Sequence, residues 1–488
     1  MNTKKVMLIR PSNTIQGDSL KRLITPLGLL YIGAVLKNKG YEVRVLDSIC
    51  EGYETERQLG NSMNFGMSDS EIASEISSFS PDIVGITSMF SAQQKDALHC
   101  CDVAKSVYEG IPVVIGGVHP TIAPRESISK SSVDFVILGE GEERFLNLVQ
   151  CMASEKNPKF DGIAYKTRTD IRINPSVSRI EDLDSLPFPA RELIDMEKYI
   201  QIGVPLGPFT RKERVEQVMT SRGCPSRCNF CTNYFGRKFR QRSIENVLSE
   251  IKMLIDEYGI QEIQFSDDNL TANKSWSKEF FAKLKEYNIS FCTPNGVMVQ
   301  TLDAEVITLM ADAGAYQTTF AIESGSERVL KEIIHKKVPS KEQVKSLTEL
   351  CHQNGMQVHG TFIVGFPGET MKEIEKTLRY PFEACFDSAS FFIANPLPGS
   401  ELYDECKAKG YLNESEYKGE FKLSEILIPR SSPDFTISKT ELEETVEKAT
   451  KEFNEFSKKR DPEAWKKKFS RFLKQHPERK ETIKGRVT

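Results

Sequence analysis

The chain has 488 residues, of which 39% are hydrophobic and 27% are charged, and its formal net charge is −4 at pH 7. This apolar content excludes a disordered chain and suffices for two to four folded domains, and the lack of any run of about 18 apolar residues argues against a transmembrane span. The nearly balanced charge excludes a dedicated nucleic-acid-binding protein, and eleven cysteines, an odd number in a long chain without a signal-peptide pattern, predict a reducing, cytoplasmic environment.

Strand-like and helix-like segments alternate over residues 1–152. Apolar runs predict strands at 6–9, 41–46, 82–87, 112–115 and 133–138, and helical spacing predicts helices at 26–39 and 93–107. Apolar strands separated by helices are typical of a Rossmann-like, doubly wound parallel sheet, which binds ligands at the carboxyl ends of its strands. The residues at these predicted strand ends are Asp47, Thr87, Ser88, Gly116, Gly117 and Gly139.

Residues 153–208 contain stretches rich in proline and glycine, and we predict that they form an extended connector. A second alternating series covers residues 209–410. Its strands are predicted at 215–220, 261–266, 290–294, 318–322, 357–364 and 389–393, with helices at 244–257 and 303–313 among those between them. Six such units indicate an α/β barrel or a partial barrel.

Residues 411–488 are predicted to form a small, helical and basic C-terminal region. Residues 451–488 contain 13 Lys and Arg against 6 Asp and Glu, and Trp465, Phe469, Phe472 and Leu473 fall on one helix face. Such a face can lie on an anionic membrane, which would allow peripheral membrane contact. A terminal helix that packs on its own barrel is the favoured interpretation.

Three of the cysteines, Cys224, Cys228 and Cys231, lie together directly after the first predicted strand of the second series. Three thiolates in one loop with Cys-x3-Cys-x2-Cys spacing suit a single soft metal centre. A structural zinc site needs four ligands, and no fourth Cys or His is near in the sequence. Three cysteines on a [4Fe–4S] cluster leave one iron open to bind a substrate. A zinc site completed by a distant ligand, or three unrelated cysteines, are the alternatives.

The segment Ser221–Cys231 resembles the signature of the radical S-adenosylmethionine superfamily. The resemblance extends over the second series and implies a partial (β/α)6 barrel. It implies that Cys224, Cys228 and Cys231 hold a [4Fe–4S] cluster, whose open iron binds the amino and carboxylate groups of S-adenosylmethionine. Phe230 matches the aromatic residue that usually lies against the adenine.

Motifs at the ends of later strands extend this resemblance. Asp267 and Asp268 stand where the family often has Gly-Gly-Glu, which contacts the methionine amino group; without the resemblance, this pair is an ordinary strand-end turn. Glu323 matches the acidic residue that reaches the ribose, and Ser324 beside it can equally be a helix cap. Residues 362–368 resemble the fifth-strand motif behind the adenine, and 395–400 the exit from the sixth strand. The implied S-adenosylmethionine contacts are Phe230, Asp267, Asp268, Glu323, Ser324, Ile363, Gly365 and Phe366.

The N-terminal sheet resembles the cobalamin-binding domain that precedes many radical S-adenosylmethionine enzymes. In the usual Asp-x-His-x-x-Gly motif the histidine ligates cobalt, whereas here Asp47 and Gly52 keep the ends and Ile49 occupies the histidine position. This implies base-off cobalamin without a histidine ligand; a sheet that has lost cobalamin is the alternative. His119 can contact cobalamin or cap a helix. The implied cobalamin contacts are Asp47, Thr87, Ser88, Gly116, Gly117, His119, Gly139, Glu140 and Gly141.

The combined resemblance implies an anaerobic C-methyltransferase. A 5′-deoxyadenosyl radical would activate an unactivated carbon, methylcobalamin would supply the methyl group, and an external electron donor of the flavodoxin or ferredoxin class would reduce the cluster. The alternatives are an enzyme of the same architecture that catalyses cyclisation, ring contraction or carbon–carbon bond formation, and a non-catalytic cobalamin or iron–sulfur sensor. The substrate is expected to be a small molecule, either a lipid or hydrophobic natural product or a polar metabolite. No catalytic residue is assigned from the sequence.

Overall fold

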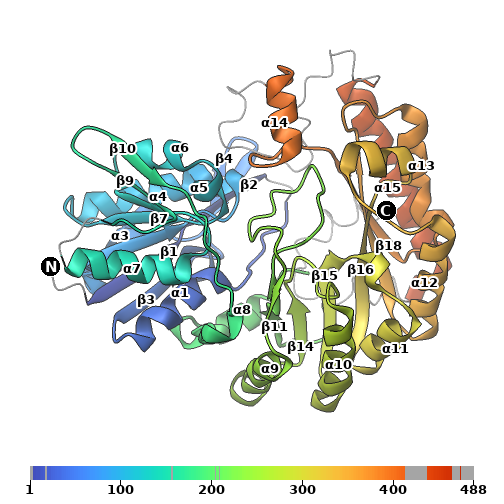
Figure 1. Ribbon diagram of the computed structural model, residues 1–488, viewed down its shortest axis with the longest axis horizontal. Helices are drawn as coiled ribbons and strands as arrows, with labels where there is room; N and C mark the ends of the chain where they lie inside the picture. Colours follow the sequence, from blue (N-terminus) through green and yellow to red (C-terminus); the bar gives the residue numbers. More distant parts are fainter. Residues whose placement is uncertain are drawn as a thin grey trace. The chain divides into compact units, whose positions relative to one another are not determined.

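The computed structural model describes residues 4–16, 19–154, 158–203, 205–207, 209–412, 437–463, 466 and 473. The described residues form two compact units, one up to Gln201 and one from Ile202 onward (Figure 1). Within the described part of the chain, no helix combines the length and the apolarity needed to cross a membrane.

The first unit is built on a seven-stranded sheet with the order β10-β9-β8-β7-β6-β1-β3. The five strands from β8 to β3 are parallel, which confirms the predicted doubly wound sheet. Two antiparallel strands, β9 and β10, extend one edge and come from the predicted connector. The strands are β1 (Lys5–Arg10), β3 (Glu42–Asp47), β6 (Ile83–Thr87), β7 (Val113–Gly116), β8 (Phe135–Ile137), β9 (Ile163–Lys166) and β10 (Ile171–Asn174).

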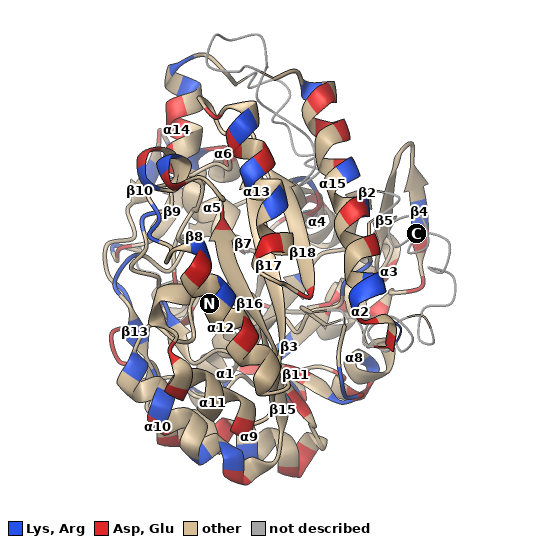
Figure 2. Ribbon diagram, turned by 90° about the vertical axis from the view of Figure 1, so that its right-hand side faces the viewer, with Lys and Arg blue, Asp and Glu red and all other residues tan. Residues whose placement is uncertain are grey.

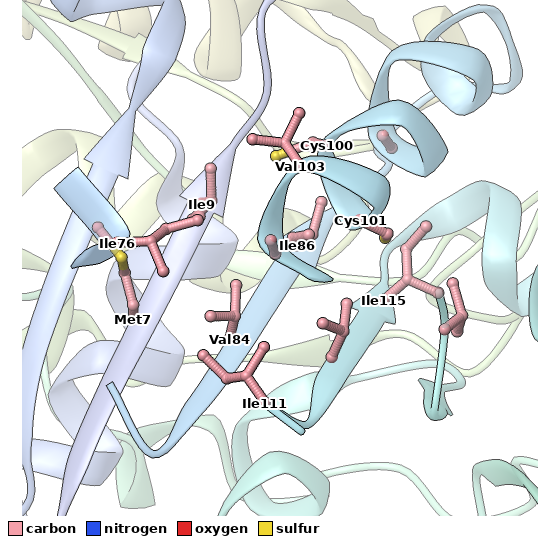
Figure 3. Packing of buried hydrophobic residues seen from close by; sticks show 14 of the residues in the cluster. Met7, Ile9, Ile76, Val84, Ile86, Cys100, Cys101, Val103, Ile111 and Ile115 are labelled. Carbon is pink, nitrogen blue, oxygen red and sulfur yellow. The ribbon is translucent and has the colours of Figure 1, made fainter. Parts of the chain in front are cut away.

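Helices cover both faces of this sheet. The side chains of β1 point alternately to one face and to the other, and both sets are apolar and buried. Met7 and Ile9 pack with residues of α3 and α4 on one face (Figure 3), and Val6 and Leu8 pack with residues of α1 and α7 on the other. Burial on both faces is why these strands read as continuous apolar runs. The helices are α1 (Leu27–Asn38), α2 (Ser48–Glu51), α3 (Asp69–Phe79), α4 (Gln94–Val107), α5 (Val118–Ile122), α6 (Pro124–Ser129), α7 (Gly141–Ala153) and α8 (Met196–Ile202).

A small antiparallel sheet that the sequence did not predict lies in the first unit. Its strands are β2 (Asn13–Gln16), β5 (Ser62–Phe65) and β4 (Glu56–Leu59), in that order. The backbone N–H and the hydroxyl of Thr14 donate to Asp96 of α4 at 2.7 and 2.8 Å. These bonds attach the small sheet close to the carboxyl end of β1.

The second unit contains a six-stranded, all-parallel sheet with the order β11-β14-β15-β16-β17-β18. The first and last strands do not pair with each other, so the sheet is the predicted partial barrel. Two short strands, β12 (Ser221–Arg222) and β13 (Arg240–Gln241), pair antiparallel. The six barrel strands are β11 (Val215–Val218), β14 (Glu262–Phe265), β15 (Ser290–Val297), β16 (Ala315–Glu323), β17 (Gln357–Val364) and β18 (Ser388–Ile393).

Amphipathic helices follow the barrel strands. In α9, Ser243 caps the first turn by accepting a hydrogen bond from the N–H of Asn246 at 3.2 Å, and Val247, Ile251 and Leu254 form the buried face. The helices are α9 (Ile244–Tyr258), α10 (Lys274–Leu284), α11 (Ala304–Asp312), a π-helix (Val329–Ile334), α12 (Lys341–Gln353), α13 (Met371–Glu383), α14 (Glu401–Ala408) and α15 (Lys439–Arg460).

The C-terminal helix α15 packs on the barrel, beside β18 and α13. The rings of Phe382 and Phe453 lie 4.9 Å apart, and the Ser457 hydroxyl donates to the Asp387 carbonyl at 2.6 Å. Basic and acidic residues are interspersed along α15 (Figure 2). The predicted apolar face of Trp465, Phe469 and Phe472 lies outside the described residues.

Candidate functional site

In the first unit, the chain adds strands first on one side of β1 and then on the other, so the sheet has a switch point between β1 and β6. From β1 the chain adds β3 on one side, and then β6, β7 and β8 on the other. Ligands of such sheets bind outside the carboxyl ends of the strands at this switch point. Arg10 and Thr87 end the two strands there, and the exposed Met89 and Phe90 follow β6.

The turn after β7 requires glycine at residue 117. Gly117 has φ of 117°, and a Cβ atom there would lie 2.4 Å from the Ser88 carbonyl oxygen. Ser88 is buried, and its hydroxyl donates to Gln94 at 2.9 Å. The two loops after β6 and β7 are therefore in backbone contact, which fixes the shape of this edge of the sheet.

His119 presents a buried nitrogen at the same strand ends. Its Nδ1 lies 2.9 Å from the Ser91 hydroxyl, while its Nε2 has no hydrogen-bond partner within the described residues. Burial lowers the pKa of His119 to about 4, so the ring is neutral at pH 7. A buried ring nitrogen that makes no hydrogen bond and lies 3.9 Å from the Glu126 carboxylate fits a site for a polar ligand.

We expect His119 to make folding stability depend on pH. The folded chain keeps the ring neutral down to a pKa of about 4, whereas the unfolded chain binds a proton below 6.5. Stability should therefore fall as the pH drops between these values, by about 3 kcal/mol in all, and stay level above them. Urea unfolding across this range checks the slope, and His119→Asn, which can keep the bond to Ser91, should reduce it; an unchanged slope would contradict the assignment.

Other predicted cobalamin residues hold the loops of the first unit together. The Asp47 carboxylate accepts from the N–H groups of Ile49 and Cys50 at 3.0 and 3.3 Å and from Arg10 at 3.2 Å, and it also accepts from the Tyr199 hydroxyl. Ile49, at the vacant histidine position, is buried. This network leaves the Asp47 carboxylate engaged with the protein's own groups.

The loop after β8 is also fixed by its own contacts. The Gly139 N–H donates to the Thr121 hydroxyl at 2.8 Å, and the Glu140 carboxylate accepts from the Ile180 N–H at 3.0 Å. Gly141 begins α7 directly afterwards. The first unit thus brings Thr87, Ser88, Gly116, Gly117, His119 and Gly139–Gly141 to the carboxyl edge of its sheet.

The three clustered cysteines lie between β12 and β13 of the second unit. Cys228 is buried, Cys224 is partly buried and Cys231 is exposed, and all three are free thiols. The Cys224 N–H donates to the Gly236 carbonyl at 3.1 Å, and the Cys231 N–H donates to the Cys228 carbonyl at 3.2 Å. The loop therefore wraps back on itself around the thiols.

No three His, Cys, Asp or Glu side chains among the described residues converge on a single metal ion. A [4Fe–4S] cluster does not need such convergence, because each cysteine binds a different iron atom. A second turn glycine supports the loop: Gly223 has φ of 89°, and a Cβ there would lie 2.4 Å from the Lys238 carbonyl oxygen.

Buried amide groups without partners surround this loop. The structure gives no hydrogen-bond partner, within its described residues, to Asn229 Oδ1, Asn233 Oδ1 or Asn269 Nδ2. The same holds for both amide atoms of Gln241 and of Asn395. A buried polar atom left unpaired costs about 1–3 kcal/mol. Five such side chains at the cysteine loop and the strand ends fit a polar ligand such as S-adenosylmethionine.

The two adjacent aspartates after β14 have different environments. Asp267 is buried, and its carboxylate accepts hydrogen bonds from the Thr220 N–H, from the Thr220 hydroxyl at 2.7 Å and from the Ser221 hydroxyl. Asp268 is exposed and accepts a hydrogen bond from the Gly223 N–H. Asp267 thus anchors the base of the cysteine loop, and Asp268 remains accessible to a ligand.

We expect the two aspartates to differ sharply when replaced. Asp267→Ala leaves the buried Thr220 and Ser221 donors unpaired and should lower the free energy of unfolding by about 3 kcal/mol. Asp268→Ala removes an exposed side chain and should change it by less than about 0.5 kcal/mol. Urea unfolding of the two apoproteins makes the comparison, and equal losses would refute the anchoring role of Asp267.

Strand β16 ends in an unusual pair of buried charges. The Lys336 ammonium lies 2.8 Å from the Glu323 carboxylate, and the two side chains are 7% and 9% exposed. The neighbouring Ser324 is buried, and its hydroxyl lies 3.1 Å from that of Thr377 and accepts from the Ser326 N–H. Ser324 therefore holds the turn before the helix, whereas Ser326 caps the helix by accepting from the Val329 N–H at 3.4 Å.

Aromatic residues from distant segments meet beside the cysteine loop. The rings of Phe230 and Phe366 lie 6.1 Å apart, and Phe230 and Ile363 pack against the same buried cluster. The N–H groups of Gly365 and Phe366 donate to the Glu369 carboxylate. The sequence motifs for an adenine pocket are thus brought together around one turn.

Several residues of this region were not identified from the sequence. Lys336 and Glu369 are single charged residues whose burial and partners only the fold shows, and Gln241 and Asn395 are neutral amides. A lysine 13 residues after Glu323 has no recognisable spacing. Only the sixth-strand motif around Asn395 gave any signal.

Two parts of the chain match known protein families. Residues 14–149 match the B12 binding domain, and residues 218–380 match the radical SAM superfamily. The first match covers most of the doubly wound sheet, and the second covers the cysteine loop and most of the barrel.

Curated relatives match nearly the whole chain. The cytidylyl-2-hydroxyethylphosphonate methyltransferase of Streptomyces wedmorensis is 38% identical in an alignment of 461 positions that covers 87% of this chain and 86% of the relative. An uncharacterized methyltransferase of Pyrococcus horikoshii is 33% identical over 84% of this chain and 85% of its own length.

Among solved structures, the radical S-adenosylmethionine methyltransferase TsrM of Kitasatospora setae, with cobalamin and a [4Fe–4S] cluster bound, has a TM-score of 0.67. The alignment covers 83% of this chain and 75% of that chain at 16% identity, which shows a common fold. Together with the curated relatives, the two family matches give the cofactors as a [4Fe–4S] cluster, S-adenosylmethionine and cobalamin. The chain therefore belongs to the cobalamin-dependent radical S-adenosylmethionine methyltransferases.

Proposed function

We propose that this enzyme methylates an unactivated carbon of a small, oxygen-rich polar molecule of the hydroxyalkylphosphonate or nucleotide-linked phosphonate class. The observation that carries the proposal is the 38% identity to a cytidylyl-2-hydroxyethylphosphonate methyltransferase over 87% of this chain. A lipid or hydrophobic natural product is less favoured, because that relative is named for a charged nucleotide ester.

In the second unit, Cys224, Cys228 and Cys231 hold the cluster. Phe230, Ile363, Gly365 and Phe366 form the adenine pocket, Glu323 contacts the ribose, and Asp268 contacts the methionine amino group. Asp267 and Ser324 do not contact the ligand. They position the neighbouring residues through their hydrogen bonds with Thr220 and Ser221 and with Thr377, respectively. When bound, the cluster and S-adenosylmethionine supply the 5′-deoxyadenosyl radical, and methylcobalamin supplies the methyl group.

In the first unit, the strand-end loops form the cobalamin site. Gly116, Gly117 and Gly139 line the site at the strand ends, where Gly117 and Gly139 let the loops pack closely on Ser88 and Ser176. The His119 Nε2 pairs with a polar group of the ligand. Asp47 shapes the neighbouring loop, because its carboxylate is already engaged by Arg10 and Tyr199. Because Ile49 occupies the histidine position, this chain would offer no histidine to cobalt there, and base-off cobalamin would be held by the surrounding loops instead. The remaining loop residues are Thr87, Ser88, Glu140 and Gly141.

The proposal includes two partners. An external one-electron donor of the flavodoxin or ferredoxin class reduces the cluster. The basic sequence around residues 465–473 gives the chain peripheral affinity for anionic membranes. Flotation of the full chain with anionic and with neutral liposomes tests the second point, and equal binding to both would contradict it.

The substrate class is tested with anaerobically reconstituted enzyme, methylcobalamin, S-adenosylmethionine and a reductant. Separate reactions contain cytidylyl-2-hydroxyethylphosphonate, free 2-hydroxyethylphosphonate or a phospholipid extract. We expect one phosphonate to gain a single methyl group, detected by mass spectrometry. Methylation of lipid with both phosphonates unchanged would overturn the proposed substrate class.

A further inference from the structure

Lys336 is a buried cation that the cofactor assignment leaves without a role. It follows the π-helix Val329–Ile334, whose last turn is closed by His335 in the left-handed conformation, with φ of 62°. The Lys336 N–H donates to the Leu330 carbonyl at 2.8 Å, which fixes the backbone where the lysine leaves the helix. π-helical turns are rare, and they are frequent at functional sites.

This π-helix is packed directly against the cysteine loop. The Asn229 N–H, next to Cys228, donates to the Ile334 carbonyl at 3.1 Å. Cys228 belongs to the same buried cluster as Val329, Leu330 and Ile334. The end of the π-helix that carries Lys336 is therefore attached to the loop that carries Cys228.

The charges at this junction are unscreened by water. Lys336 and Glu323 lie 2.8 Å apart, with side chains that are almost fully buried. Lys336 lies two residues after Ile334, whose carbonyl accepts the Asn229 N–H beside Cys228. The buried ion pair is therefore attached to the loop that carries Cys228.

We propose that Lys336 sets the reduction potential of the cluster: its ammonium group, held by Glu323 next to the helix that packs on the Cys228 loop, stabilises the reduced state. The inference rests on the proposed role of Cys228 as a cluster ligand. Lys336 acts through the charge that it places near that ligand, and Glu323 fixes the position of the charge.

The step concerned is a one-electron reduction. A [4Fe–4S]2+ cluster becomes [4Fe–4S]+ by taking one electron from a low-potential ferredoxin-class or flavodoxin-class donor, which is itself oxidised by one electron. No bond is formed or broken. Because the reduced cluster carries one more negative charge, a fixed cation nearby lowers its free energy more than that of the oxidised cluster. Buried charges are only weakly screened by salt.

The test compares cluster midpoint potentials in the full-length, reconstituted chain without S-adenosylmethionine, measured by redox titration followed by electron paramagnetic resonance. K336M leaves the carboxylate unopposed and should lower the potential. E323Q leaves the ammonium unopposed and should raise it. K337M changes the adjacent exposed lysine and should leave it unchanged.

The double variant E323Q/K336M keeps the test valid if K336M alone fails to fold, because it contains neither buried charge. Its potential should lie below that of E323Q. Equal potentials for E323Q and the double variant, or shifts of the same sign for E323Q and K336M, would overturn the inference. A wild-type chain that assembles no cluster would instead refute the proposed cysteine ligands, so the two failures are distinguishable.

Discussion

Replacing Cys224, Cys228 or Cys231 by alanine is expected to abolish methyl transfer. Each substitution removes one of the three proposed ligands, and the loop contains no other described thiol that could replace it. Iron content should fall from about four atoms per chain to well below one. Iron analysis, the visible absorption of the cluster and formation of 5′-deoxyadenosine measure the effect.

Cys406→Ala is the matched control. Cys406 is fully buried in the same hydrophobic cluster as Cys228, but it lies on α14 outside the loop. We expect it to keep its iron and its activity and to lose about 1 kcal/mol of stability. If a loop variant retained its cluster and still formed 5′-deoxyadenosine, the ligand assignment would be wrong.

Gly117→Ala should have the second largest effect, in the first unit. The new methyl group would lie 2.4 Å from the Ser88 carbonyl oxygen, and the residue would have to keep φ of 117°. The clash and the backbone strain together should lower the free energy of unfolding by about 3 kcal/mol. Displacement of the loop after β7 should also abolish cobalamin binding, which equilibrium dialysis measures.

The neighbouring Gly116→Ala variant is the control, because it adds the same methyl group without the clash and the backbone strain expected at Gly117. A Cβ at Gly116 would be 3.6 Å from the Ile137 carbonyl oxygen, an ordinary contact. Its stability should stay within about 0.5 kcal/mol of the wild type in urea unfolding. Equal losses of stability in both variants would show that the geometry of Gly117 is not what restricts this turn.

Much of the fold could be predicted because a strand that is buried on both faces of a sheet appears in the sequence as a continuous apolar run. Val6, Met7, Leu8 and Ile9 form a continuous apolar run, and all four are buried. The small sheet β2-β5-β4 could not be predicted in the same way. Its strand β4 is largely exposed, and its strand β2 joins β5 through residues about 50 positions apart, such as Thr14 and Asn64.

For the site, spacing singled out the three cysteines, and the resemblance to the radical S-adenosylmethionine superfamily supplied the aspartate pair and the adenine motif. The sequence could not divide the roles of Asp267 and Asp268, because the difference arises from hydrogen bonds to Thr220 and Ser221, about 46 residues away. Lys336 could not be singled out from the sequence. It differs from the other lysines by its burial and by its partner Glu323, and neither property has a sequence pattern.

The most direct test of the account is the fate of the methyl group of S-adenosylmethionine. Reconstituted enzyme is supplied with methyl-labelled S-adenosylmethionine under anaerobic conditions, and all products are analysed by mass spectrometry. The account predicts a product that carries the label at carbon, with 5′-deoxyadenosine and S-adenosylhomocysteine formed alongside it. A rearranged or cyclised product without label would contradict methyl transfer, and failure to cleave S-adenosylmethionine at all would contradict catalysis.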